Sequence, residues 1–165
     1  MESINEIYFA GGCFWGVEAF FKKVPGVLET TVGYANGKTL NTNYKTLKET
    51  DHSETVYIKY NKNEIFLEKL LDYYFKIINP TSINKQGNDI GRQYRTGIYY
   101  TDENDLGIIK NKINEEQKKY EDEIQVEVEK LDNYILGEEY HQNYLDKNPN
   151  GYCHINMKEA IKIIK

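Results

Sequence analysis

Cysteine and proline are scarce in this sequence, which has only two cysteines and three prolines among 165 residues. The cysteines, Cys13 and Cys153, form neither a Cys-x-x-Cys pair nor a Cys/His pair at zinc-ligand spacing. A small protein stapled by disulfides is therefore excluded, and a structural metal is disfavoured. The length suits one domain, residues 1–165, built around one hydrophobic core.

Long apolar runs and clusters of basic residues are also missing. No run approaches the ~18 apolar residues of a membrane span, and residues 1–6 have neither the basic nor the apolar region of a signal peptide. The 21 Lys and Arg against 26 Asp and Glu give a net charge of −5 without a dense basic patch. We therefore expect a cytoplasmic protein with reduced thiols, with neither nucleic acid nor an anionic membrane as a partner. We also expect a monomer.

Aromatic side chains are plentiful: 15 Tyr, 6 Phe and one Trp make up 13% of the residues. They fit an ordinary packed core, and they would also fit a small pocket lined with phenolic hydrogen-bond donors. Composition alone leaves both interpretations open.

Hydrophobic periodicity predicts strands that alternate with helices. The expected strands are residues 4–9, 27–34, 54–60, 97–100 and 124–129. The expected helices are residues 14–21, 64–78, a segment that begins after Asp102 and includes 106–113, 138–145 and 155–164. No periodicity is found from 38 to about 51, and residues 80–96 form a long polar loop of the kind that is usually functional or disordered. The pattern favours an α+β class: one two-layer domain with a mixed, largely antiparallel sheet, flanking helices and a long irregular C-terminal segment.

Cys13 has the location of a reactive cysteine. It follows an expected strand and the Gly11-Gly12 turn, and it lies at the first turn of an expected helix. Unpaired N–H groups and the positive end of the helix dipole favour a thiolate there. The alternative is a buried structural cysteine, and location alone does not decide between the two.

The segment Gly12-Cys13-Phe14-Trp15-Gly16 resembles the signature of the A-type peptide methionine sulfoxide reductases. Further segments similar to motifs of that family extend along nearly the whole chain. In order they are Gly33-Tyr34-Ala35-Asn36-Gly37, Gln86-Gly87-Asn88-Asp89, Gln93-Tyr94-Arg95, Tyr140-His141-Gln142 and Lys147-Asn148-Pro149-Asn150-Gly151-Tyr152-Cys153.

The resemblance implies an enzyme that reduces methionine S-sulfoxide, free or in proteins, without a cofactor or metal, and that repairs oxidative damage with thioredoxin or a similar thiol reductant. The implied catalytic residues are Cys13 as the nucleophile, Glu54 as the acid, Tyr44 and Tyr94 as donors to the sulfoxide oxygen, and Cys153 as the resolving thiol. The implied substrate-binding residues are Phe14 and Trp15 around the S-methyl group and Asp89 at the substrate backbone.

Three segments depart from the family pattern. The usual Thr-Gly-His-Ala-Glu is Thr50-Asp51-His52-Ser53-Glu54, the usual His-Asp-Pro-Thr is Ile78-Asn79-Pro80-Thr81, and an Ala before the last Glu-Glu pair is Gly137. No implied catalytic group is lost. The departures leave open how Glu54 is packed and how the 80–96 loop is supported.

The chemistry of a sulfoxide suits these residues. Its oxygen is a poor leaving group, so attack on sulfur needs a proton on oxygen, a contribution of about 10²–10⁴-fold. Glu54 shares a strand face with apolar residues and could stay protonated, although a solvent-exposed carboxylate at a strand end is the alternative. Tyr44 and Tyr94 lie in polar loops, where phenols could donate to the oxygen. Cys153 lies in a turn-rich segment suited to reaching a sulfenic acid on Cys13; the alternative is a surface cysteine without a role.

Two other functions compete with this one. A cysteine hydrolase would use Cys13 with His141 or His52 as the base and would not need Cys153. A non-catalytic module with an aromatic-lined pocket would need neither thiol to be reactive. Each histidine has a simpler interpretation as a polar loop or helix-face residue, with His141 ordering the C-terminal segment.

Overall fold

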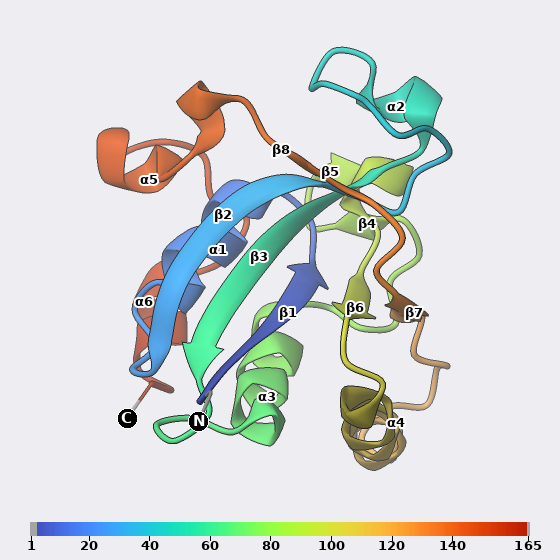
Figure 1. Ribbon diagram of the computed structural model, residues 1–165, viewed down its shortest axis with the longest axis vertical. Helices are drawn as coiled ribbons and strands as arrows, with labels where there is room; N and C mark the ends of the chain where they lie inside the picture. Colours follow the sequence, from blue (N-terminus) through green and yellow to red (C-terminus); the bar gives the residue numbers. More distant parts are fainter. Residues whose placement is uncertain (1–2, 165) are drawn as a thin grey trace.

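The computed structural model describes residues 3–164 as one six-stranded sheet, a small hairpin and several helices (Figure 1). The sheet order is β7-β6-β1-β3-β2-β8, and all neighbours are antiparallel except β6 and β7, which are parallel. Its strands are β1 (Ile4–Ala10), β2 (Val27–Ala35), β3 (Ser53–Asn61), β6 (Gly97–Tyr100), β7 (Glu127–Lys130) and β8 (Tyr134–Leu136). The helices are α1 (Phe14–Phe21), α2 (Leu47–Thr50), α3 (Leu67–Ile77), α4 (Asn104–Gln117), α5 (Tyr144–Lys147) and α6 (Met157–Ile161). The predicted α+β class with a mixed, largely antiparallel sheet is confirmed.

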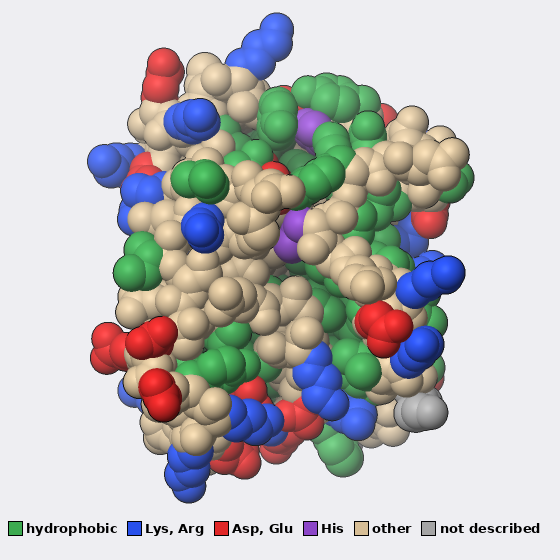
Figure 2. All heavy atoms as spheres, turned by 180° about the vertical axis from the view of Figure 1, so that it is seen from behind, with side chains coloured by type: hydrophobic (Ala, Val, Ile, Leu, Met, Phe, Trp, Pro, Cys, Tyr) green, Lys and Arg blue, Asp and Glu red, His purple; other side chains and the backbone are tan. Residues whose placement is uncertain are grey.

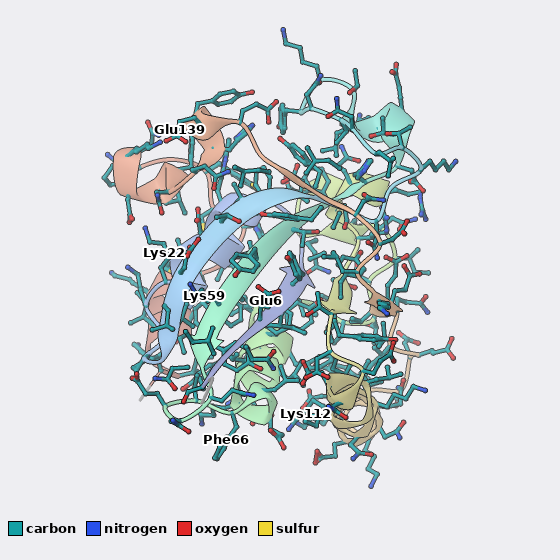
Figure 3. All side chains as sticks on the ribbon, viewed as in Figure 1. Glu6, Lys22, Lys59, Phe66, Lys112 and Glu139 are labelled. Atoms are coloured by element: carbon teal, nitrogen blue, oxygen red, sulfur yellow. The ribbon has the colours of Figure 1, made fainter. Side chains whose placement is uncertain are left out.

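The two faces of the sheet differ because side chains alternate along each strand. Val56 and Ile58 of β3 point to the helix side, where α1 and α3 cover the sheet and form the main core with it (Figure 1). Glu6 and Lys59, which are paired across β1 and β3, lie on the opposite face (Figure 3). On the same face, the Tyr57 hydroxyl of β3 donates to the Glu6 carboxylate of β1 at 2.8 Å.

The long elements agree with the periodicity, with small differences at their ends. Helix α3 begins at Leu67 rather than at residue 64, and strand β7 begins at Glu127 rather than at 124. The expected helix over 155–164 is shorter in the structure, where α6 covers Met157–Ile161. Asp102 is expected to cap α4, but the N-cap is Glu103; the Asp102 carboxylate, one residue earlier, still accepts the backbone N–H of Asn104 at 2.9 Å.

Short elements occupy the two stretches for which no helix or strand is expected, residues 38 to about 51 and residues 80–96. Helix α2 lies in the first stretch, and the second holds a hairpin of β4 (Lys85–Gln86) and β5 (Asp89–Ile90) followed by a single 3-10 turn, η1 (Arg92–Tyr94). A helix of one turn, or a strand of two or three residues, completes too little of a period to be seen in a sequence. Strand β8 escapes prediction for the same reason.

The expected helix over 138–145 is wrong. The chain instead forms a 3-10 turn, η2 (Glu139–His141), and then the separate helix α5, with Asn143 between them at φ 54°. Two contacts with the core explain the break. The Gln142 amide bonds to the backbone of Val32 in β2 at 2.8 and 2.9 Å, and the carboxylate of Glu18 in α1 accepts the Asn143 N–H at 2.9 Å. Tertiary hydrogen bonds thus replace those of a continuous helix.

Residues 3–164 include no helix that is long and apolar enough to cross a membrane. In the same described range, His, Cys, Asp and Glu side chains form no group of three or more that could hold a metal ion. Both cysteines are free thiols, Cys13 buried and Cys153 partly exposed.

Candidate active site

Cys13 lies between the end of β1 and the first turn of α1. Gly12 has φ +86°, a left-handed value that suits glycine, and Cys13 follows as the N-cap of the helix. Cys13 is 7% exposed, and the nearby backbone N–H of Trp15 acts to lower the pKa of its thiol. A nearly buried sulfur therefore faces the N-terminal end of a helix.

Glu54 lies at the start of β3 beside this helix end. Its side chain is buried, and its Oε1 accepts the backbone N–H of Phe14 at 3.2 Å. Burial raises the pKa of Glu54 from 4.5 to about 8; the Phe14 N–H opposes this shift and the charge of Asp89 adds to it. The group is therefore a protonated acid at neutral pH, and Oε2 is left to carry the proton. The alternative of a solvent-exposed carboxylate is wrong.

The protonation state of Cys13 differs from the expectation. Burial raises the pKa of the Cys13 thiol well above its usual range, and the charges of Glu54 and Asp89 act in the same direction against the Trp15 N–H. Loss of water around the sulfur outweighs the favourable helix end. The thiolate favoured by sequence position is thus wrong for the resting protein, which holds a neutral thiol beside a neutral acid.

Tyr44 and Tyr94 meet Glu54 and Asp89 in a cavity of about 570 Å³. Burial, followed by the charge of Glu54, raises the pKa of both Tyr44 and Tyr94, so both keep their protons at neutral pH. The cavity therefore contains three O–H donors, two phenols and one carboxylic acid, that a weakly basic oxygen could accept from.

Glu138 fixes the loop that carries Tyr44. One carboxylate oxygen accepts the Tyr34 hydroxyl at 2.6 Å, and the other accepts the backbone N–H of Tyr44 at 2.9 Å. Burial alone would raise the pKa of Glu138, but these hydrogen bonds lower it, so it remains a carboxylate. Sequence reasoning misses this residue because a Glu in a polar segment is ordinarily solvated.

Phe14 and Trp15 belong to an aromatic cluster next to the thiol. Phe14 is buried with its ring 5.2 Å from that of His141, and the Trp15 indole N–H donates to Nδ1 of His141 at 3.0 Å. Tyr144 stacks on the Trp15 ring at 3.7 Å and 8°. Apolar side chains gather in the upper part of the helix side of the molecule (Figure 2). Neither Phe14 nor Trp15 is among the residues that line the cavity, so the cluster lies beside it.

The three histidines have other partners than Cys13. Their hydrogen-bond partners are the Thr50 hydroxyl for His52, the Trp15 indole for His141 and the Gly11 carbonyl for His154. Within residues 3–164, none of them is hydrogen-bonded to the Cys13 thiol. The cysteine–histidine pair that a hydrolase needs is thus not formed in the described structure.

Cys153 lies against α1, one helical turn from Cys13. Its Sγ is 2.8 Å from the point where a Cβ of Gly16 would stand, and it donates to the carbonyl of Ile155 at 3.3 Å. Residues three apart on a helix are neighbours on its surface, so both thiols lie on the same side of α1. Burial raises the pKa of Cys153, which is therefore also a neutral thiol.

Asp89 reaches the cavity from β5. Its Oδ2 accepts the hydroxyl of Tyr152 at 3.0 Å, which links the hairpin to the segment before Cys153. Gln86 of β4 ties the hairpin to the end of the α3 segment. Its amide oxygen accepts the backbone N–H of Asn79 at 2.8 Å, and its amide nitrogen donates to the Asn79 carbonyl at 2.9 Å. Asn79 stands where the family pattern has Asp, and the backbone contacts made here do not depend on that side chain.

The departure at Asp51 adds an ion pair. Asp51 ends α2 with φ 61°, a left-handed value that glycine adopts more easily. Its carboxylate accepts two hydrogen bonds from the guanidinium of Arg92, at 2.6 and 3.0 Å, and the hydrogen bonds from Arg92 lower the pKa of Asp51. Because Arg92 begins the turn that carries Tyr94, this bidentate pair connects α2 with one of the two phenols.

The comparisons with known proteins agree with this geometry. A family model described as peptide methionine sulfoxide reductase matches residues 5–165. The reduced form of Mxr1 from Saccharomyces cerevisiae is 37% identical, with a TM-score of 0.87 over 94% of this chain and 91% of that one. Methionine sulfoxide reductase A of Corynebacterium diphtheriae is 32% identical, with a TM-score of 0.88 over 93% of this chain and 79% of that one.

A further solved structure is a complex. Mxr1 from Saccharomyces cerevisiae bound to Trx2 is 26% identical to this chain, with a TM-score of 0.63, and the match covers 86% of this chain and 85% of that one. The sequence motifs, the fold and the comparisons therefore all agree with one another in relating this chain to the same group of proteins.

Proposed function

The chain belongs to the peptide methionine sulfoxide reductase family, and we propose that its thiol-dependent reduction of methionine sulfoxide uses Cys13 as the nucleophile and the S epimer as the substrate, free or in proteins. The observation that carries this proposal is the buried, protonated Glu54 at the same helix end as the Cys13 thiol. A thiol alone cannot displace a sulfoxide oxygen, and an acid at that place supplies the missing proton.

In the proposed first step, the sulfur of Cys13 attacks the sulfoxide sulfur while Glu54 protonates the oxygen. The oxygen then passes to the Cys13 sulfur: the temporary bond between the two sulfurs and the S–O bond of the substrate break, an S–O bond forms on Cys13, and the products are methionine and a Cys13 sulfenic acid. The thiol proton of Cys13 returns to Glu54, so the step needs no cofactor and no further reductant. Tyr44 and Tyr94 donate to the oxygen as negative charge grows on it, which their raised pKa values allow.

The substrate would be held from two sides. Phe14 and Trp15 place apolar rings beside Cys13, where the S-methyl group would lie. Asp89 presents a carboxylate to the cavity, where it could accept an N–H of the substrate backbone.

In the proposed second step, Cys153 converts the sulfenic acid into a Cys13–Cys153 disulfide. Its position against Gly16, one turn from Cys13, supports this role. A thioredoxin-type donor then reduces the disulfide, which the complex of Mxr1 with Trx2 supports. We propose a reducing compartment such as the cytoplasm for this reaction, which the need for such a donor supports.

We propose no second function. The comparisons do not support the hydrolase alternative, and the described histidines are engaged elsewhere than at Cys13.

The epimer preference is tested with the two resolved epimers of a methyl sulfoxide substrate and dithiothreitol as the reductant. We expect the S epimer to be consumed and the R epimer to remain, because one fixed face of the substrate sulfur can meet Cys13 while the oxygen points to Glu54 and the phenols. Consumption of both epimers at equal rates would contradict the proposed substrate.

Cys153→Ser separates the two steps. We expect the variant to release about one equivalent of methionine per enzyme in a single turnover, because formation of the sulfenic acid needs only Cys13. It should fail to turn over with thioredoxin, which needs a disulfide to attack, and should cycle in part with dithiothreitol. Quantifying methionine with each reductant is the measurement. Wild-type turnover of the variant with thioredoxin would show that Cys153 is not the resolving thiol.

A further inference from the structure

We propose that His154 is a positioning residue that holds the Cys153 thiol against α1 before any oxidation takes place. The inference rests on the proposed role of Cys153 and adds the group that docks this thiol. Docking of the Cys153 thiol by His154 would make the second step fast, so that the sulfenic acid on Cys13 is short-lived.

The contact that carries the proposal is a hydrogen bond between His154 and the turn before Cys13. Nε2 of His154 lies 2.9 Å from the carbonyl oxygen of Gly11. A carbonyl can only accept, so the imidazole donates and carries its proton on Nε2. Nδ1 is buried without a hydrogen-bond partner among the described residues, so the Nε2–H bond is the one polar contact that orients the ring.

The surface that receives this segment is made by two glycines on either side of Cys13. A Cβ on Gly12 would stand 2.9 Å from Nε2 of His154, and a Cβ on Gly16 would stand 2.8 Å from Sγ of Cys153. Both distances are shorter than ordinary van der Waals contact, so neither position has room for a side chain in the docked arrangement. Two consecutive residues of the C-terminal segment thus fit against two glycines of the nucleophile's turn.

Few other hydrogen bonds tie this segment to the rest of the protein. Within the described structure, side chains of residues 152–155 bond outside their own segment at two places, His154 to Gly11 and Tyr152 to Asp89. Tyr152 is 43% exposed, so its bond competes with water. Ile155 adds apolar contact as part of the main core. The His154 bond is therefore the polar contact that fixes where the neighbouring thiol lies.

Docking matters for the second step because the thiol must reach one atom. Sγ of Cys153 attacks the sulfur of the Cys13 sulfenic acid, the S–O bond breaks, and the hydroxyl leaves as water with the proton of the Cys153 thiol. The two sulfurs share the new bond, and no outside oxidant or reductant takes part. A thiol held one helical turn away attacks at a much higher effective concentration than one on a free segment.

The test is a rapid-quench single turnover with one equivalent of methionine S-sulfoxide and no reductant, using the full chain. Methionine release measures the first step, and mass spectrometry after alkylation measures the Cys13–Cys153 disulfide. His154→Ala removes the donor, whereas His154→Gln keeps an N–H near the position of Nε2. Asn156→Ala is the matched control, because it removes the cap of α6 in the same segment without touching Gly11.

We expect His154→Ala to form the disulfide about five- to tenfold more slowly, the change in docked population that follows the loss of one typical hydrogen bond. Its methionine release should keep the wild-type rate, and His154→Gln and Asn156→Ala should form the disulfide at close to the wild-type rate. If His154 acted only by packing, His154→Gln and His154→Ala would form the disulfide equally slowly, and that result would overturn the proposal.

The remaining outcomes separate this proposal from the function on which it rests. Disulfide formation at the wild-type rate in His154→Ala would overturn the docking role alone. Slower methionine release in His154→Ala would assign the bond to the geometry of Cys13 and would also overturn it. If the wild type released methionine but formed no Cys13–Cys153 disulfide, the resolving role of Cys153 would be wrong, and the docking role with it.

Discussion

Replacing Cys13 with serine is expected to abolish methionine formation, including the first turnover. A serine hydroxyl ionises far above neutral pH and is a hard nucleophile, so it does not attack the sulfur of a sulfoxide. The second thiol does not replace it, because Cys153 is packed against Gly16 and bonded to the Ile155 carbonyl, whereas Cys13 lies at the helix end that also holds Glu54. Methionine measured after mixing enzyme and substrate in equal amounts should not exceed the background without enzyme.

The matched control for this variant is Cys153→Ser, which makes the same atom exchange at the other thiol. It should release about one equivalent of methionine under identical conditions. Thermal unfolding of both variants checks the fold, because serine keeps the shape of cysteine but places a smaller and more polar atom at the position of the sulfur. One equivalent of methionine from the Cys13→Ser variant would show that the nucleophile has been assigned to the wrong residue.

Cys13 and Glu54 can be placed from the sequence because each belongs to a long, regular element. The alternation along β3 puts Glu54 on the buried face, and the glycine turn before α1 puts Cys13 at a helix end. Both arguments use local periodicity, which a sequence displays directly. The strands and helices with the clearest periodicity are also those that the structure confirms.

The residues that hold the site in place are not visible in this way. Glu138 bonds to Tyr34 and Tyr44, partners about a hundred residues away in sequence. His154 bonds to the Gly11 carbonyl, which lies 143 residues earlier in the sequence. Such contacts come from folding the irregular C-terminal segment over α1, and no periodic pattern predicts where an irregular segment lies. The same folding breaks the expected helix at Asn143.

The pKa values show a third limit. The sequence places Cys13 at a helix N-terminus and predicts an acidic thiol, since the dipole is a property of the helix alone. Burial depends on everything packed around the sulfur, and it raises the pKa of Cys13 instead. For Glu54 the same effect of burial agrees with the sequence, because the apolar strand face already indicated it.

Glu54→Gln should slow the chemical step by about 10²–10⁴-fold, the usual contribution of a general acid. The amide keeps the shape of the side chain and an oxygen that can accept the Phe14 N–H, so substrate binding should change little. Single-turnover methionine formation at several substrate concentrations gives the rate and the binding constant separately. Glu6→Gln, on the opposite face of the sheet, is the matched control and should keep the wild-type rate.

The pH dependence provides a second readout of the same group. With a pKa of about 8 in the folded protein, Glu54 holds its proton below that value and loses it above. The wild-type single-turnover rate should therefore fall as the pH rises through about 8, and the residual rate of Glu54→Gln should lack this fall. A glutamine variant with the wild-type rate, or with the same loss of rate near that pH, would remove Glu54 as the acid.

Stability distinguishes loss of the acid from loss of the fold. The pKa of Glu54 is about 8 in the folded protein against 4.5 as its ordinary value, so the folded state binds the proton more tightly than the unfolded state. The stabilising effect of that proton is complete below 4.5 and is lost as the pH rises toward 8. Glutamine needs no proton to stay neutral, so Glu54→Gln should unfold at a higher temperature than the wild type at pH 8, with a smaller difference at pH 5. If Glu54→Gln is inactive and also more stable than the wild type at pH 8, burial of Glu54 serves to keep its carboxyl group protonated for the reaction. Lower stability at both pH values would instead attribute the slow reaction to damaged packing.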